Sequence, residues 1–327
     1  MKSVSPVRPI TPTPQLLPVI LALCSLLGSA VAGPFLPGEI FVDDINGSTI
    51  RRYSASGTLL QTYSQAPSGT GTGGSWAGVA LTPDGNLVTS YRVLNGFTFV
   101  PGIDIFNPSG TQTKTFPVTS SVTTEDVSVF ASGTLALTAG NLNIVQFWSQ
   151  TGTLLKSVSL LGVTGTAGST VGSDGILYVA GNTSHNIARV SAAGVSLGNV
   201  SIGFAPGDLV MNPTDGTLWV SGASNFLVEH ITTNGTVLGS FATGLSGSFN
   251  GIGLAPDNNS LYVIGSLSTV VKHFDLSGNL LDSFALASPN TPFFLTVVPN
   301  PTPEPGSATL LLGGLALLAA RRRRAST

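Results

Sequence analysis

Acidic and amide side chains stand at comparable places along the chain and are the first candidates for chemistry. Glu125 and Asp126 directly precede an apolar segment. Asp208 and Asn250 precede the corresponding apolar segments farther along the chain. Carboxylate and amide oxygens are the ligands that a hard cation such as Ca²⁺ prefers. The sequence therefore predicts a candidate divalent-cation site at these four residues. The alternative is that they are solvated loop residues, which the glycines and alanines at the other comparable positions favour.

Groups suited to acid–base or nucleophilic catalysis are few. His230 and His273 occupy equivalent positions in adjacent repeats, too far apart for one ion, and His185 lies in a different kind of loop. No Gly-x-Ser-x-Gly motif occurs, and the one cysteine, Cys24, lies close to the N-terminus. We therefore predict no catalytic residues and favour a binding role over an enzymatic one.

A short apolar phrase ending in a turn glycine repeats through the body of the chain. The glycines fall about 42 residues apart after a longer first interval, which is the period of a propeller blade. They are Gly57, Gly110, Gly152, Gly194, Gly235 and Gly278. At one fixed distance before them stand Ile50, Ile103, Val145, Ile187, Val228 and Val271. The longer first interval predicts an insertion at 64–75 or at 92–101.

Each phrase after the first is preceded by a hairpin motif around an Asp-Gly-type turn, as at Asp84-Gly85 and Asp174-Gly175. Each repeat therefore contains four strands. Only five opening strands accompany the six phrases, and the apolar segment 293–298 has no partner. Its pairing with the first phrase would complete a sixth blade and remove exposed sheet edges. We predict an all-β fold, a six-bladed β-propeller over 39–299 closed by 293–298.

The phrase Ile-x-Arg-x-Asp-x-x-Gly resembles the repeats of NHL-type six-bladed propellers, with Arg52 and Arg189 at the basic position. This resemblance implies the architecture and no particular activity. The candidate cation ligands resemble those of propeller lactonases similar to gluconolactonase, which hold a divalent metal with Glu, Asn and Asp. That resemblance implies an alternative function, an extracellular metal-dependent hydrolase or lactonase.

The first 32 residues have the pattern of a signal peptide. Lys2 and Arg8 are basic, an apolar stretch follows, and Ala30 and Ala32 supply the small residues before a cleavage site. Cleavage after Ala32 removes Cys24, so no disulfide is expected in the mature protein. The alternative, a retained membrane anchor, would have an apolar run that is short for spanning a bilayer.

The C-terminal end combines Pro303, Glu304 and Pro305 with an apolar stretch at 306–320 and the basic cluster Arg321, Arg322, Arg323 and Arg324. These parts, in this order, resemble the PEP-CTERM sorting tail of Gram-negative bacteria, over about 25 residues. The resemblance implies a processing protease of the exosortase type and association with exopolysaccharide. The arginines should stay cytoplasmic and leave the body outside the inner membrane. We expect a sorting tail over 300–327, with 306–320 as a membrane helix.

Charge limits the partners of the secreted body. The targeting segments hold 6 of the 13 basic residues and 1 of the 15 acidic residues, which leaves the body at about −7. Nucleic acid requires a basic face, so we expect no nucleic-acid partner. The expected partners are polysaccharide or a surface protein, and the expected location is the cell surface or extracellular matrix.

Overall fold

The computed structural model describes residues 35–44, 49–63, 74–95, 98–118, 122–247, 250–287 and 291–300. Within these ranges the chain forms six antiparallel sheets of four strands each. We number the sheets as blades 1 to 6 in the order in which their outer strands occur in the chain. The predicted all-β six-bladed propeller is confirmed.

The strands have the following bounds. Blade 1 has β24 (Pro292–Val297), β1 (Ile40–Asp44), β2 (Thr49–Tyr53) and β3 (Leu59–Tyr63), and blade 2 has β4 (Gly74–Leu81), β5 (Leu87–Asn95), β6 (Thr98–Phe106) and β7 (Gln112–Pro117). Blade 3 has β8 (Thr124–Val129), β9 (Leu135–Ala139), β10 (Ile144–Trp148) and β11 (Leu154–Ser159), and blade 4 has β12 (Thr166–Val171), β13 (Ile176–Gly181), β14 (Asn186–Ser191) and β15 (Ser196–Ser201). Blade 5 has β16 (Pro206–Asn212), β17 (Thr217–Gly222), β18 (Leu227–Ile231) and β19 (Val237–Ala242), and blade 6 has β20 (Asn250–Leu254), β21 (Ser260–Gly265), β22 (Val270–Asp275) and β23 (Leu280–Ala285).

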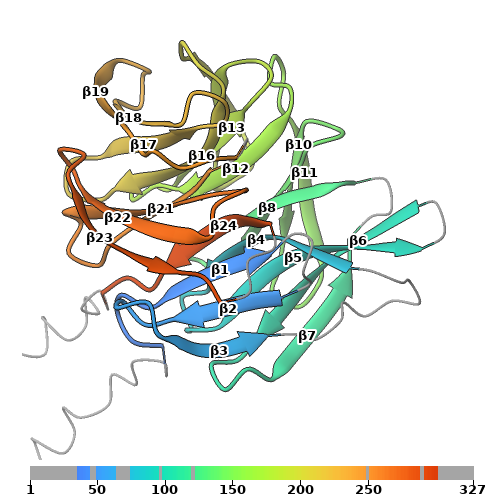
Figure 1. Cartoon of the computed structure of the whole chain (residues 1–327). Coiled ribbons are helices and arrows are strands. Elements are labelled where there is room, and N and C mark those ends of the chain that lie inside the picture. Colours follow the sequence, from blue (N-terminus) through green and yellow to red (C-terminus); the bar gives the residue numbers. More distant parts are fainter. Residues whose placement is uncertain are drawn as a thin grey trace, which may run out of the picture. The chain divides into compact units, whose positions relative to one another are not determined.

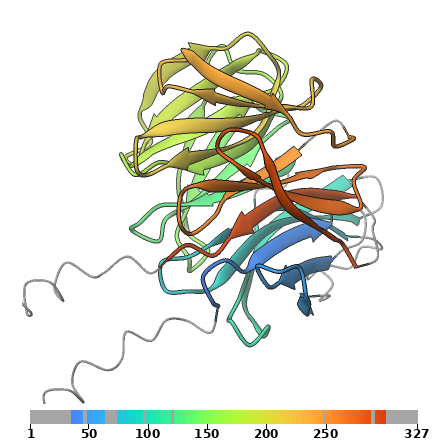
Figure 2. The same ribbon diagram turned by 60° about the vertical axis from the view of Figure 1, so that its left-hand side comes forward.

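The innermost strands β24, β4, β8, β12, β16 and β20 contact one another in sequence and close a ring. Figures 1 and 2 show the blades arranged around this ring, and in blades 2 to 6 the chain runs from the innermost strand to the outermost one. Because neighbouring strands are antiparallel, all innermost strands begin on one face, which also carries the connections between blades. We call this face the loop face. The opposite face, which carries the tight turns between strands one and two and between strands three and four, is the turn face.

The ring closes where the last strand of the chain meets the first. β24 pairs with β1 in antiparallel register, with Val297 opposite Ile40. Glu39, just before β1, is bonded by the Arg52 guanidinium through two N–H···O contacts of 2.9 and 2.8 Å, and Arg52 also stacks over Phe35. The predicted closure is confirmed, with β24 starting one residue earlier than expected.

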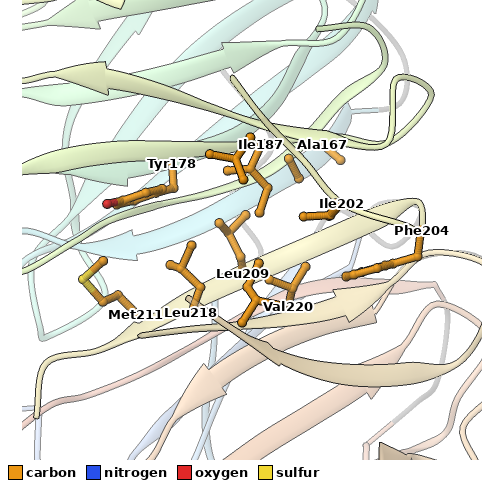
Figure 3. Close-up of a cluster of buried hydrophobic side chains, with 12 residues drawn as sticks. Ala167, Tyr178, Ile187, Ile202, Phe204, Leu209, Met211, Leu218 and Val220 are labelled. Atoms are coloured by element: carbon orange, nitrogen blue, oxygen red, sulfur yellow. The ribbon is translucent and has the colours of Figure 1, made fainter. Parts of the chain in front are cut away.

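Hydrophobic side chains fill the six interfaces between adjacent blades. Each of six buried clusters draws its members from two neighbouring blades. Figure 3 shows the cluster between blades 4 and 5, in which Tyr178 and Ile187 of blade 4 pack against Leu209, Leu218 and Val220 of blade 5. Strand side chains alternate between the two faces of a sheet, so a blade must be apolar on both faces to fill two interfaces. This requirement explains why apolar residues occupy most strand positions.

The repeated glycines lie in the tight turns between the third and fourth strands, on the turn face. All six have a positive φ, between 67° at Gly194 and 88° at Gly235. A Cβ at Gly152 would come within 2.9 Å of Phe116, a residue of the preceding blade, and a Cβ at Gly235 would meet Val200 in the same way. The repeat therefore requires glycine both for the turn conformation and for the contact between blades.

Several sequence predictions fall outside the described residues. They are the signal peptide with Ala30 and Ala32, the motif at 303–305, the apolar stretch 306–320 and the basic cluster 321–324. Among the residues that the structure describes, no helix has the length and apolar character needed to cross a bilayer. Part of the predicted insertion lies in blade 2, whose strands β5 and β6 are each nine residues long and form an extended hairpin.

Candidate functional site

Three buried aspartates surround the axis near the loop face, and we call them the carboxylate belt: Asp43, Asp126 and Asp208. They belong to blades 1, 3 and 5, so every second blade contributes one. The strand pairing shifts register at each of them, between Val42 and Asp44, Thr124 and Asp126, and Pro206 and Asp208. Such β-bulges re-aim side chains, and here they accompany carboxylates directed toward the neighbouring blade.

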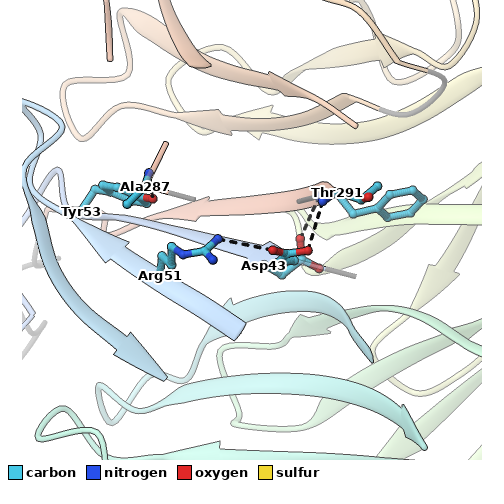
Figure 4. A network of polar contacts seen from close by, with 7 residues as sticks. Asp43, Arg51, Tyr53, Ala287 and Thr291 are labelled. Atoms are coloured by element: carbon cyan, nitrogen blue, oxygen red, sulfur yellow. Dashed lines mark hydrogen bonds and ion pairs between the residues drawn. The ribbon is translucent and has the colours of Figure 1, made fainter. Parts of the chain in front are cut away.

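Asp43 joins blade 1 to blade 2. Its Oδ1 accepts hydrogen bonds from the backbone N–H groups of Phe293 (3.1 Å) and Phe294 (2.6 Å), which are innermost residues of its own blade. Its Oδ2 accepts a bond from the N–H of Gly78 in blade 2 at 3.1 Å. Beside it, Asp44 accepts a bond from Thr291 N–H and pairs with Arg51 at 3.4 Å; Figure 4 shows this region of the seam.

Asp126 and Asp208 make the same kind of bridge in the other two pairs of blades. Asp126 Oδ2 accepts bonds from the backbone N–H (2.7 Å) and hydroxyl (2.8 Å) of Ser169 in blade 4. Asp208 Oδ1 accepts from Leu209 N–H in its own strand, and its Oδ2 accepts from Ile252 N–H in blade 6 at 3.1 Å. Each buried carboxylate thus satisfies backbone donors of the next blade, as burial requires.

Glycines in the intervening blades make room for the belt. A Cβ at Gly78 would lie 2.5 Å from Asp126 Oδ1, and a Cβ at Gly168 would lie 2.7 Å from the Asp208 Cα. Gly251 is equally tight against the backbone of β24, with Phe294 Cα at 2.9 Å. Glycine and a larger residue therefore alternate around the ring. The glycines at these positions, which suggested solvated loops from the sequence, belong to the packed centre.

Burial dominates the electrostatics of the belt. Desolvation raises the pKa of Asp43 to about 7 and that of Asp126 to about 7, against the lowering effect of their hydrogen bonds. The pKa of Asp208 is raised well above its ordinary value by burial and by the charges of Asp126 and Asp43. The three carboxylates therefore repel one another when ionised, although each is well bonded.

The structure brings three of the predicted cation ligands into one region but gives them different partners. Asp126 and Asp208 belong to the belt, whereas Glu125 pairs with Arg92 of blade 2 at 3.8 Å. Burial raises the pKa of Glu125 to about 7, partly offset by Arg92. Asn250 begins β20, where its backbone pairs with Gly265, and its side chain lies outside the described residues. In the described part of the chain, no three His, Cys, Asp or Glu side chains have the spacing of a metal site.

Asp43 was not among the predicted site residues, because it lies in the second strand of its blade and the prediction considered only the innermost strands. The signal in the sequence was an acidic pair, Asp43 and Asp44, ending the otherwise apolar strand β1. All five residues of that strand are buried. Two adjacent carboxylates in a buried strand require partners, because a lone buried charge is costly.

Two of the three histidines, His230 and His273, pack within their own blades. His230 stacks on Trp219 with ring centroids 4.1 Å apart and contacts Thr217 Oγ1 at 2.7 Å. His273 stacks on Tyr262, also at 4.1 Å, and contacts Ser260 Oγ and Asp282. The pKa of His230 is lowered, mainly by burial. The two equivalent histidines therefore act as parallel packing elements.

The two faces of the propeller differ in chemistry. From 140 onward the connections on the loop face contain no Asp, Glu, Lys or Arg, and they expose isolated apolar side chains such as Leu161 (81 % exposed) and Leu267 (70 %). The tight turns of the turn face instead carry exposed aspartates, including Asp84, Asp174 and Asp215. From 140 onward, connections without these charged residues thus lie opposite turns that carry exposed aspartates.

Solved structures similar to this chain share its architecture. A protein of unknown function from Bacteroides caccae aligns over 80% of this chain and 99% of its own, with 11% identity and a TM-score of 0.63. A chain of a nidogen–laminin complex aligns over 80% and 98%, with 16% identity and a TM-score of 0.59. Virginiamycin B lyase from Staphylococcus aureus aligns over 67% and 73%, with 18% identity and a TM-score of 0.53.

These likenesses show the fold. No protein-family model and no curated protein sequence matches the chain. The similar structures include a lyase and a chain of a nidogen–laminin complex, so the shared architecture does not indicate one function. Function must therefore be argued from the sites on this propeller.

Proposed function

We propose that the chain is an exported, surface- or matrix-associated propeller that acts as a non-enzymatic interaction protein. The observation that carries this proposal is the loop face, whose connections from 140 onward contain no Asp, Glu, Lys or Arg and expose Leu161, Leu267 and Phe226. Contiguous exposed apolar surface is typical of interaction sites, and the proposal places these side chains in the surface that contacts the partner. The belt carboxylates support the proposal because they bond backbone groups of adjacent blades.

The position of the chain ends supports presentation of this face to the exterior. Gly38 N–H donates to Val298 O at 2.9 Å, and Val298 N–H donates to Glu39 O at 2.8 Å, so the body is entered and left at one point on the turn face. A sorting tail at 300–327 would leave the propeller from that face. In a precursor anchored in the inner membrane, the loop face would then point away from the bilayer.

The interaction is tested with purified exopolysaccharide of the producing bacterium in a cosedimentation assay. We expect the secreted protein to cosediment, and we expect Leu161→Asn combined with Leu267→Asn to reduce binding at least about tenfold. Leu155→Asn is the matched control, because Leu155 is 55 % exposed but lies in the outer strand β11. Equal loss in the control, or no binding of polysaccharide and no binding of purified surface proteins, would contradict the interaction role.

Sorting is tested separately by intact-mass spectrometry of the protein in membrane and extracellular fractions. Processing by an exosortase-type protease should yield a mature form that lacks residues 1–32 and the arginines at 321–324. Glu304→Ala should retain the membrane precursor, whereas the nearby change Thr302→Ala should not. Extracellular protein with an intact C-terminus would overturn the sorting proposal and leave the interaction proposal standing.

A metal-dependent hydrolase or lactonase of propeller type is the alternative. The observation in its favour is that Glu125, Asp126 and Asp208 interact electrostatically near the loop-face end of the axis. Under this alternative the purified protein binds Ca²⁺ or another divalent cation, and replacing Asp126 and Asp208 together by Asn abolishes both metal content and lactone hydrolysis. Elemental analysis and a lactone screen separate the two functions.

A further inference from the structure

A cavity of about 660 Å³ runs along the axis of the propeller. Residues of all six innermost strands line it. On the loop-face side its lining ends at Asp126, Asp208 and Phe294, and on the turn-face side it reaches the turn residues Ser132 and Asn258. The cavity therefore ends at the carboxylate belt and opens on the turn face, opposite the face assigned to the proposed function.

The wall of this cavity is largely aliphatic. Along the innermost strands, apolar side chains line the cavity at two distances from the belt. The set farther from the belt includes Leu81, Val129, Val171 and Leu254. These four side chains line the cavity, are only partly buried, and pack with their other surfaces against the clusters between blades. Between the two sets lie small residues, among them Ala80 and Thr170. An apolar ligand would gain about 25 cal/mol for each Å² of wall and ligand surface removed from water.

The end of the cavity has the opposite character. Asp126 and Asp208 both line it, and each is about 5 % exposed or less. Asp208 Oδ1 and Oδ2 each accept one backbone N–H, and Asp126 Oδ2 accepts both donors of Ser169, so all of these partners are uncharged; each carboxylate oxygen has two lone pairs. The charged groups that act on Asp126 and Asp208 across the belt include Asp43 and Glu125, which are acidic, and Arg92 is paired with Glu125. The end of the cavity is therefore complementary to a cation.

We propose that the central cavity binds a small amphipathic cation through its turn-face opening. The ammonium head of the ligand bonds Asp126 and Asp208, and its aliphatic or aromatic body lies along the apolar wall. The volume falls in the range of pockets that enclose small organic ligands, and a few polar groups at the end of an apolar pocket are typical of such sites. This site is separate from the loop face and does not depend on the proposed function.

The test compares three probes with the same body and different heads: octylammonium, octanol and octanoate. Isothermal titration calorimetry with the purified full-length protein at pH 7.5 should show the tightest binding for octylammonium. We expect octanol to bind at least about tenfold more weakly and octanoate not measurably.

Two variants localise the binding. Ala80→Leu adds bulk at a residue that lines the cavity and should weaken octylammonium binding at least about tenfold, whereas Ala193→Leu, at an exposed turn residue that is not part of the cavity lining, should leave binding unchanged. Asp208→Asn should abolish the preference for octylammonium over octanol. Thermal melting confirms that each variant is folded; if Asp208→Asn does not fold, the Ala80 and Ala193 pair still decides.

Some outcomes would overturn the proposal. These are equal binding of all three probes, no binding of octylammonium, and unchanged binding in the Ala80→Leu protein. A fourth is displacement of octylammonium by millimolar Ca²⁺ with no effect of Ala80→Leu, which would identify the belt as a metal site.

Discussion

At the scale of single residues, buried carboxylates that accept hydrogen bonds and glycines that allow close packing stabilise the centre of this propeller. Asp43, Asp126 and Asp208 each accept a backbone N–H of the following blade. Gly78 and Gly168 leave the space that the next carboxylate and its backbone occupy. Bonding across the blades and mutual repulsion therefore act on the same three groups, which makes their protonation relevant to stability.

The belt should make the protein more stable at mildly acidic than at alkaline pH. The folded pKa values of Asp43 and Asp126 are raised to about 7 from 3.8, so the folded state binds more protons than the unfolded state between these values. This stabilisation is fully present below about pH 4 and is lost as the pH rises through 7. The thermal midpoint should rise by more than about 2 °C from pH 8 to pH 5.5, which corresponds to ~1 kcal/mol in a domain of this size.

The variants for this pH experiment are Asp126→Asn, which should flatten the dependence, and Asp84→Asn in an exposed turn, which should preserve it. Glu125 and Asp104 contribute in the same direction, because burial raises their pKa values to about 7 and about 6. His230 opposes them below its ordinary pKa, since its pKa is lowered in the folded state. A midpoint that falls steadily from pH 8 to pH 5.5 would contradict the role of the belt.

At the scale of elements, the turn between the third and fourth strands fixes each blade against the one before it. The glycine of this turn has a positive φ in every blade, and in several blades it also faces an aromatic side chain of the preceding outer strand, as Gly152 faces Phe116. Gly278 faces Phe241 of blade 5 in the same way. One residue thus satisfies a local conformation and a contact distant in sequence.

Replacing two glycines by alanine separates these two requirements, because Gly216, in the turn between β16 and β17, has only the positive φ, whereas Gly278 has both the positive φ and the contact. Gly216→Ala should cost only about 1–2 kcal/mol for a left-handed backbone, because nothing lies within 4 Å of its added Cβ. Gly278→Ala should cost about 1–3 kcal/mol more, because its Cβ overlaps Phe241 and the interface must shift. Urea denaturation measures both changes. Equal losses in the two variants would show that the turn conformation alone requires glycine.

At the scale of the whole molecule, stability depends on closing the ring. β24 supplies the innermost strand of blade 1 and also packs against β20 of blade 6 and β4 of blade 2. Glu39, Arg52 and Phe35 reinforce this seam through a buried ion pair and a cation–π contact. Every other blade is formed by consecutive strands, so this seam is the point at which distant parts of the chain must meet.

A chain that ends after Ala287 should lose the folded ring, because β1 would expose its edge and two interblade clusters would lose Phe294, Leu295 and Val297. A chain that ends after Asn300 removes only the tail and should remain folded. Size-exclusion chromatography and thermal melting compare the two. A monomeric protein with a cooperative transition after truncation at Ala287 would contradict this view of closure.

The sequence by itself determined the number of blades, their four strands and their closure. These features follow from local patterns. Apolar strand positions, turn glycines and Asp-Gly hairpins recur once in nearly every blade, and counting six phrases but five opening strands predicts that the last strand completes the first blade. The end segments likewise carried their sorting pattern in sequence order, and their function remains a proposal.

Only the tertiary structure decided what the polar residues near the axis do. Asp126 and Asp208 could be recognised from their place in the repeat, but their bonds to Ser169 and Ile252 join blades more than 40 residues apart in the chain. Asp43 reaches the same belt from a second strand because β24 comes from the other end of the chain, so no periodicity could reveal it. The cavity depends on closure of all six blades, since its wall exists only when strands from both ends of the chain meet.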